Sequence, residues 1–181
     1  MPAGLERRFA ALERQRVELI GRLEPLSDAQ HPFQPDRSSW SLAGVVHDLV
    51  LVEETFVENG RALATGRPAR VTLRARLRQQ VVLAVMARDI RVPAPSKAVV
   101  PRSHVPLVLL DARWRAARSA LLDYLAELPG PIWIRSAFYH PRAGWITAAG
   151  GLRFLQAHTR HHLRQIDRIL GAEGFPGQRS P

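Results

Sequence analysis

Four long stretches of the sequence repeat apolar residues at intervals of three and four, and breaks rich in proline and glycine separate them. This spacing places the apolar side chains of each stretch on one side of an α-helix. The expected helices cover about residues 5–24, 41–64, 106–128 and 147–170, with Ser41 as the N-cap of the second. Four helices that must each bury one apolar face predict an all-α fold, a four-helix bundle.

The connection between the second and third long helices is unusually elaborate. It contains a shorter amphipathic stretch, residues 73–88, followed by a proline-rich segment, and we interpret residues 73–104 as a crossover. A later connection, residues 132–145, is aromatic and irregular, and either a short strand or a packed loop would fit it. The chain length suits one domain, so we expect residues 1–181 to form a single bundle domain.

The composition limits which classes of protein and which kinds of functional site are possible for this chain. The chain has no cysteine, which excludes disulfides, thiolate metal sites and cysteine nucleophiles. The N-terminus lacks the apolar core of a signal peptide, and no apolar run approaches the ~20 residues that span a bilayer. We therefore expect a cytoplasmic protein with no membrane partner.

The net charge of +10 raises the question of nucleic-acid binding. The basic residues are almost all arginines spread along every helix, and Lys97 is the single lysine. Residues 67–91 are locally basic, with seven arginines opposed only by Asp89. We favour a solvated helix face over a polyanion site for this segment, which makes nucleic acid a less favoured partner.

Two histidines interrupt the apolar side of the last helix. His158 and His162 are four residues apart, so their Cβ atoms lie about 6 Å apart on one helix face, close enough for both rings to bind one ion. A single histidine at such a position is more often a core residue with satisfied hydrogen bonds. Two at this spacing are harder to explain that way, because each buried ring must find partners for both nitrogens. A metal site here still needs a third ligand.

His47 is the candidate for that third ligand, because it lies in the apolar part of the second helix. Ala43 and Gly44 precede it by one turn and would leave room for substrate beside a metal ion, as in a catalytic site with an open coordination position. Alternatively, Gly44 only permits close packing of helices. The sequence does not decide between these two interpretations.

The two histidine-bearing regions resemble those of the DinB-like family. Residues 40–54, in which Trp40 and Ser41 open a helix with a histidine and then acidic residues, are similar to the second helix of that family. Residues 144–169, centred on His158, His161 and His162, are similar to its last helix. The resemblance implies a four-helix bundle that binds one divalent metal ion through His47, His158 and His162. The family includes thiol-dependent transferases and isomerases, predicted hydrolases and members of unknown activity.

Other polar residues near these positions rank lower as ligands. Gln165 would either orient a ligand or lie on the helix surface, and His161 is expected beside the site or at the surface. His140 could line the mouth of a pocket, but we favour exposure to solvent for it, and we expect Asp48 and Glu53 to be solvated. Glu54 shares a face with His47 but lies two turns away, about 10.5 Å along the axis.

Three functions remain open at this point. The first is a metal-dependent transferase that uses a low-molecular-weight thiol, or a hydrolase, acting on a small molecule, with zinc or nickel ahead of iron and copper as the metal. The second is a non-catalytic metal-binding bundle protein, and the third is a basic nucleic-acid-binding protein. A zincin protease is excluded because Thr159 stands where its glutamate is required. The sequence assigns no catalytic residue and leaves a homodimer open.

Overall fold

The computed structural model describes the chain except for residues 38, 69, 89–99, 102–104, 129–134 and 178–181. The sequence prediction of helices is confirmed to within a few residues at each end. The elements are α1 (Ala3–Leu23), α2 (Leu42–Ala62), α3 (Leu73–Ala87), α4 (Leu107–Glu127), β1 (Ser136–His140), β2 (Gly144–Thr147) and α5 (Ala148–Leu170).

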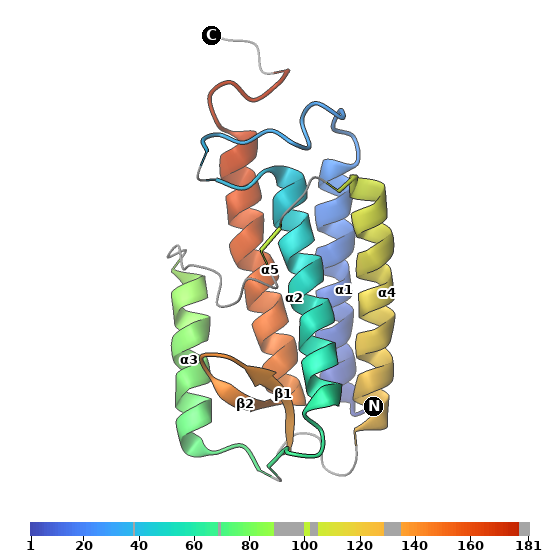
Figure 1. Cartoon of the computed structure of the whole chain (residues 1–181), viewed down its shortest axis with the longest axis vertical. Coiled ribbons are helices and arrows are strands. Elements are labelled where there is room, and N and C mark those ends of the chain that lie inside the picture. Colours follow the sequence, from blue (N-terminus) through green and yellow to red (C-terminus); the bar gives the residue numbers. More distant parts are fainter. Residues whose placement is uncertain (38, 69, 89–99, 102–104, 129–134, 178–181) are drawn as a thin grey trace.

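Helices α1, α2, α4 and α5 form the bundle and lie side by side along the long axis of the molecule (Figure 1). Each contacts two neighbours: α1 packs against α4 and α5, and α2 packs against the same two helices. Figure 1 shows that α1 and α5 run in one direction and α2 and α4 in the other. The all-α bundle expected from the sequence is therefore confirmed.

Helix α3 forms the first part of the crossover. Because α2 and α4 run in the same direction, the chain must return along the bundle between them, and α3 makes that return beside α5 (Figure 1). Its first turn is capped by Thr72, whose hydroxyl accepts a hydrogen bond from the amide of Ala75. The later part of the predicted crossover, including Lys97 and His104, falls largely outside the described residues.

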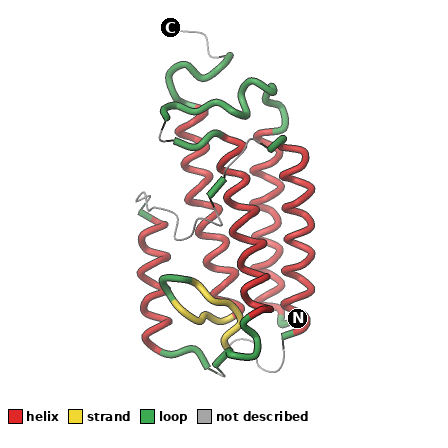
Figure 2. Tube along the Cα trace, viewed as in Figure 1, coloured by secondary structure: helices red, strands yellow, loops and turns green. Residues whose placement is uncertain are grey.

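The aromatic connection before α5 contains a β-hairpin, drawn in yellow in Figure 2. Strands β1 and β2 pair antiparallel, and Gly144 opens β2 with a φ of +80°, a conformation that favours glycine. The ring nitrogen Nδ1 of His140 accepts hydrogen bonds from the amides of Arg142 and Ala143, which closes the turn. Strand β2 leads directly into α5, whose N-cap is Thr147, so the hairpin fixes the start of the helix that carries His158 and His162.

The interior of the bundle consists of two apolar clusters. One surrounds Leu12, Phe56, Leu121 and Leu155, and the other surrounds Leu19, Val46, Leu110 and Ile166. On each of the four helices a buried polar residue lies in the stretch between the two clusters. These residues are Arg16 of α1, Glu53 of α2, Arg118 of α4 and His162 of α5. We call this level of the bundle the polar layer, and it contains the candidate site.

Candidate metal centre

Three side chains meet where α2 faces α5 in the polar layer. Asp48 comes from α2, while His158 and His162 come from successive turns of α5. The Nε2 atoms of the two histidines are 3.0 Å apart. Oδ2 of Asp48 is 3.0 Å from Nε2 of His162 and 3.3 Å from Nε2 of His158. We call these three residues the His/Asp cluster.

Asp48 is buried, so the expectation that it is solvated was wrong. Only 3% of its surface is exposed, and its neighbours Val45, Val46 and Leu49 are equally buried. The reason is that α2 contacts α4, α5 and β1, so more than one side of this helix lies inside the protein. An acidic residue next to the core-facing seam is therefore enclosed and requires a partner.

Gln165 orients one of the histidines, as one of the two interpretations of the sequence proposed. Its Oε1 lies 2.8 Å from Nδ1 of His162 and is a hydrogen-bond acceptor, so Nδ1 carries the proton. In a neutral ring, the other nitrogen of His162 then has a free lone pair. That lone pair points at Asp48, whose ionised carboxylate is also an acceptor.

The pKa values in the cluster reflect burial and this close contact. Burial alone would raise the pKa of Asp48, but hydrogen bonds and charge from His158 and His162, which these rings supply when protonated, outweigh it and lower that pKa to about 2. Burial lowers the pKa of His158, and the neighbouring His162 lowers it further. Asp48 is therefore an anion, and burial favours a neutral, ligating form of His158.

The spacing of the three atoms matches a metal site. Ligand atoms about 2.1 Å from one ion are about 3.0 Å apart when adjacent in an octahedron and about 3.4 Å apart in a tetrahedron. The observed separations of 3.0, 3.0 and 3.3 Å fall at or between these values. Two imidazoles and one carboxylate are also a donor set found in catalytic zinc and non-haem iron sites. The residues present thus fit a divalent transition metal.

His47 lies next to this cluster in sequence but contacts a different helix. It is buried, with 8% of its surface exposed, and its Nε2 is 3.4 Å from Nη1 of Arg113 on α4. Arg113 also donates to both carboxylate oxygens of Glu54, at 3.2 and 2.7 Å. The cluster of mutually close ligand atoms contains Asp48 rather than His47. The predicted ligand role of His47 stays a prediction.

A family model described as the DinB superfamily matches residues 11–166 of the chain. The chain belongs to the DinB superfamily. The resemblance found in the two histidine-bearing regions is thereby extended to most of the protein. No curated protein gives a significant match. No helix of the described residues is both long and apolar enough to span a membrane.

Aromatic rings cover the two histidines of the cluster in this DinB-superfamily protein. Trp40 stacks on His162 with ring centroids 5.9 Å apart, and Phe154 stacks on His158 at 5.7 Å. A Cβ atom added to Gly44 would lie 3.3 Å from Oγ of Ser41 and 3.5 Å from Cβ of Trp40. The nearest neighbours of Gly44 thus belong to the segment that caps its own helix, so the choice between the open-site and the packing interpretations stays undecided.

The hairpin turns His140 inward, so the expectation that it is exposed was wrong. Only 5% of its surface is exposed, and its ring packs edge-on against Phe154 at 4.6 Å. Burial, with the charges of His158 and Arg142, lowers the pKa of His140 to about 4. His161 lies beside the cluster, with its ring edge-on to His162 at 5.2 Å.

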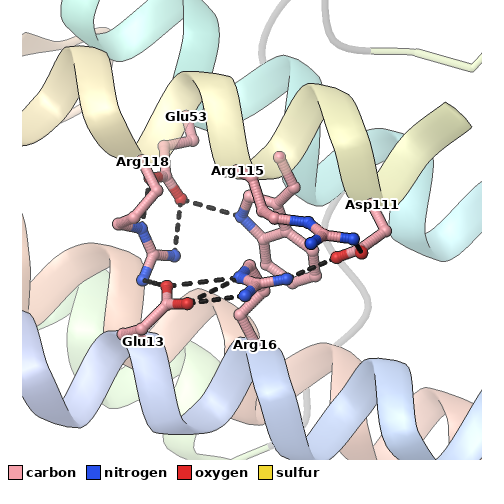
Figure 3. Close-up of polar contacts among 7 residues, drawn as sticks. Glu13, Arg16, Glu53, Asp111, Arg115 and Arg118 are labelled. Carbon is pink, nitrogen blue, oxygen red and sulfur yellow. Dashed lines mark hydrogen bonds and ion pairs between the residues drawn. The ribbon is translucent and has the colours of Figure 1, made fainter. Parts of the chain in front are cut away.

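Glu53 is also buried, which corrects the second expectation of a solvated acid on α2. Its carboxylate accepts from Nε and Nη2 of Arg118 at 2.7 and 3.0 Å, and from the indole of Trp114 at 2.9 Å. Figure 3 shows these residues continuing into a chain of ion pairs between α1 and α4. We call this group the ion network; it comprises Glu13, Arg16, Glu53, Asp111, Trp114, Arg115 and Arg118.

Proposed function

We propose that this DinB-superfamily protein binds one divalent transition metal ion through Asp48, His158 and His162 and uses it to transfer or hydrolyse a group on a small molecule. The observation that carries the proposal is the convergence of two imidazole Nε2 atoms and one carboxylate oxygen within 3.3 Å of one another. Gln165 supports it, because a hydrogen bond to Nδ1 is the usual way in which a metal-ligating histidine is oriented.

A metal ion held there supplies Lewis acidity, which lowers the pKa of water or of a thiol and makes either a better nucleophile. Among the described residues, the carboxylates of Asp48, Glu53 and Glu54 on α2 are not available to assist. Asp48 is part of the cluster, Glu53 is bound by Arg118 and Trp114, and Glu54 is bound by Arg113. This shortage of an available carboxylate supports a thiol over water as the nucleophile, because a thiolate needs no separate base. A low-molecular-weight thiol is therefore the proposed co-substrate.

The carboxylate alters the expected choice of metal. Three histidines would suit zinc or nickel, whereas two histidines and Asp48 form a harder donor set that also accepts iron(II). We propose zinc as the first candidate, with nickel and iron(II) to be compared. Reconstitution with each metal in turn, followed by competition with a chelator, would rank them.

The test of the site is metal content after purification without an affinity tag, followed by reconstitution and dialysis. The wild type should retain about one ion per chain. Asp48→Asn and the double variant His158→Ala with His162→Ala should lose it, while His161→Gln, on the same helix, should keep it. Full loading of the double variant would refute the site.

The same measurement decides which residue of α2 is the ligand. If Asp48 is the ligand, His47→Ala retains its metal and Asp48→Asn does not. The opposite pattern would restore the set expected from the family, His47 with His158 and His162. Helicity measured by circular dichroism on each variant separates loss of a ligand from loss of the fold.

A non-catalytic role is the second candidate, and the burial of Asp48 and His162 is the observation that favours it. The cobalt(II)-substituted protein distinguishes the two candidates through its absorption spectrum. Low-molecular-weight thiols should shift that spectrum if the metal has an open position. A spectrum unchanged by thiols and by hydrolysable esters would leave the metal with a structural role.

A further inference from the structure

The outward face of α3 carries an apolar stripe that nothing in the described part of the chain covers. Leu73, Leu77 and Val81 follow one another at four-residue intervals and are 73%, 60% and 63% exposed. The opposite face of α3 is anchored by Ala75 and Gln79, which are buried, and Gln79 donates to the carbonyl of Gly150 on α5. Figure 1 shows α3 at the edge of the molecule, beside α5 and the hairpin.

Arginines line both sides of this stripe. Arg74 and Arg78 follow Leu73 and Leu77, Arg76 lies on the other side, and all three are exposed. Helix α3 contains no acidic residue, and none of the three arginines forms an ion pair with an acidic residue that the structure describes. We call these six residues, Leu73, Arg74, Arg76, Leu77, Arg78 and Val81, the α3 face.

Some arginines elsewhere in the protein are paired with acids. Arg16 and Arg118 neutralise carboxylates in the interior, and Arg22 pairs with Asp167 on the surface at 2.5 Å. On the α3 face, three guanidinium groups surround exposed aliphatic side chains with no acid to balance them. The described residues thus provide no partner for either the hydrophobic stripe or the positive charge of +3 beside it.

We propose that the α3 face docks an acidic amphipathic helix of another protein. A helix with leucine or valine on its contact side would cover the stripe, because residues at intervals of three and four meet in the packing of two helices. Glutamates beside those leucines would pair with Arg74, Arg76 and Arg78 across the interface, as charged flanking positions do in coiled coils. This proposal is independent of the metal site.

Charge and shape argue against the other occupants. A second copy of this chain would bring identical arginines together across a symmetric contact, which is unfavourable. A nucleic acid would place phosphates over three exposed aliphatic side chains. A lipid surface is the closest competitor, yet the exposed stripe contains no tryptophan, phenylalanine or tyrosine of the kind that anchors helices at a bilayer interface.

The test uses the full-length protein and a synthetic helical peptide of about three heptads, with leucine at the contact positions and glutamate at the flanking ones. The matched control is the same peptide with lysine in place of glutamate. Fluorescence anisotropy of the labelled peptides should show binding of the glutamate peptide at least about tenfold tighter than that of the lysine peptide. Arg78→Glu and Leu77→Gln should each weaken the glutamate peptide several-fold.

Two variants serve as controls for those substitutions. Arg14→Glu changes an exposed arginine on α1, and Val108→Gln changes a residue on α4 that is 72% exposed. Both should bind the glutamate peptide as the wild type does. Equal weakening by Arg14→Glu would reduce the effect to net charge and overturn the proposal.

Four other outcomes would also overturn the proposal. Two of them are failure of the glutamate peptide to bind and dimerisation of the wild type that Leu77→Gln abolishes. Tighter binding of vesicles of equimolar phosphatidylserine and phosphatidylcholine, lost in Leu77→Gln, would assign the face to a membrane surface. Tighter binding of a short mixed-sequence DNA duplex, lost in Arg78→Glu, would assign it to nucleic acid.

Discussion

The polar layer of the bundle contains two groups of buried charged residues. Each group encloses carboxylates, and the two groups stabilise them in different ways. In the ion network, every carboxylate is met by a guanidinium, and the donors point directly at the acceptors (Figure 3). In the His/Asp cluster, the only partners that the described residues offer the carboxylate of Asp48 are two imidazoles, and burial lowers the pKa of one of them, His158. Both groups place carboxylates inside the protein, but only the first has permanent positive charges to balance them.

The comparison shows why one group is structural and the other can bind an ion. Guanidinium groups have no lone pair to offer a metal, and their five N–H donors are always protonated. Neutral imidazoles have a lone pair, and Gln165 holds the proton of His162 on the nitrogen away from Asp48. In the ion network, the guanidinium and carboxylate charges balance one another. The His/Asp cluster gathers three atoms that could serve together as ligands of a divalent cation.

Removal of a carboxylate charge from the ion network should have the largest effect on stability. Glu53→Gln should lower the free energy of unfolding by about 3 kcal/mol, because Arg118 would lose its bidentate partner while only 4% exposed. Glu13, 3.1 Å from Arg118, keeps the effect at the low end of the range for broken buried pairs. Urea unfolding of the wild type and of Glu53→Gln measures this loss of stability.

Glu54→Gln is the matched control for that variant, because Glu54 is bound by Arg113 near the surface, with 28% of its side chain exposed. It should cost no more than about 1 kcal/mol. Equal losses for the two variants would mean that burial does not distinguish the ion network from a surface ion pair. Metal content should be that of the wild type in both, since neither residue belongs to the His/Asp cluster.

The fold was largely predictable, because it depends on patterns that survive without tertiary information. The spacing of Leu12, Leu19 and Leu23 in α1 and of Leu110, Trp114 and Leu121 in α4 identified core faces that the structure confirms. Ser41 was recognised as an N-cap from its position before an apolar run, and its hydroxyl accepts from the amide of Gly44 at 3.0 Å. The hairpin remained undecided because its strands are short and depend on packing against α2, α3 and α5, which the sequence does not show.

The candidate site was only half predictable. His158 and His162 were identifiable because both ligands lie on one helix, where the spacing alone sets their geometry. Asp48 and Glu53 were missed because their partners lie on other helices. A signal was present in the sequence: Val45, Val46, Leu49 and Val50 are apolar on several sides of α2. A helix surrounded in that way buries its acidic residues as well.

His140 is a buried histidine outside the His/Asp cluster, and its titration shows what burial alone does to an imidazole. The folded-state pKa of His140 is about 4, below the ordinary 6.5, so below pH 6.5 the unfolded chain binds a proton that the folded chain does not. Its contribution to stability is therefore fully present above pH 6.5 and falls as the pH drops towards 4. His158 acts in the same direction, since its pKa is also lowered.

His140→Asn should remove this part of the pH dependence, because Oδ1 of asparagine can still accept from the amides of Arg142 and Ala143. Between pH 8 and pH 5, the wild type should lose about 2 kcal/mol more than the variant. Urea unfolding of the metal-free protein at both pH values measures the difference, with Tyr139→Phe as the neutral control on the same strand. Parallel losses in His140→Asn and the wild type would show that His140 does not titrate on unfolding.

Gln165 should affect metal affinity less than the ligands do, and its variants distinguish a ligand cluster from a chance contact of polar groups. Gln165→Leu removes the acceptor for Nδ1 of His162, so the ring can turn or take its proton on Nε2, and metal affinity should fall about tenfold, or about 1.4 kcal/mol. Gln165→Glu offers a carboxylate oxygen to the same N–H and should restore the affinity. Competition with a chromogenic chelator measures both variants. If Gln165→Leu binds metal as the wild type does, the hydrogen bond is incidental and the orientation of His162 depends on stacking against Trp40. In the ion network no such outer residue is needed, because a guanidinium presents its donors in a fixed plane.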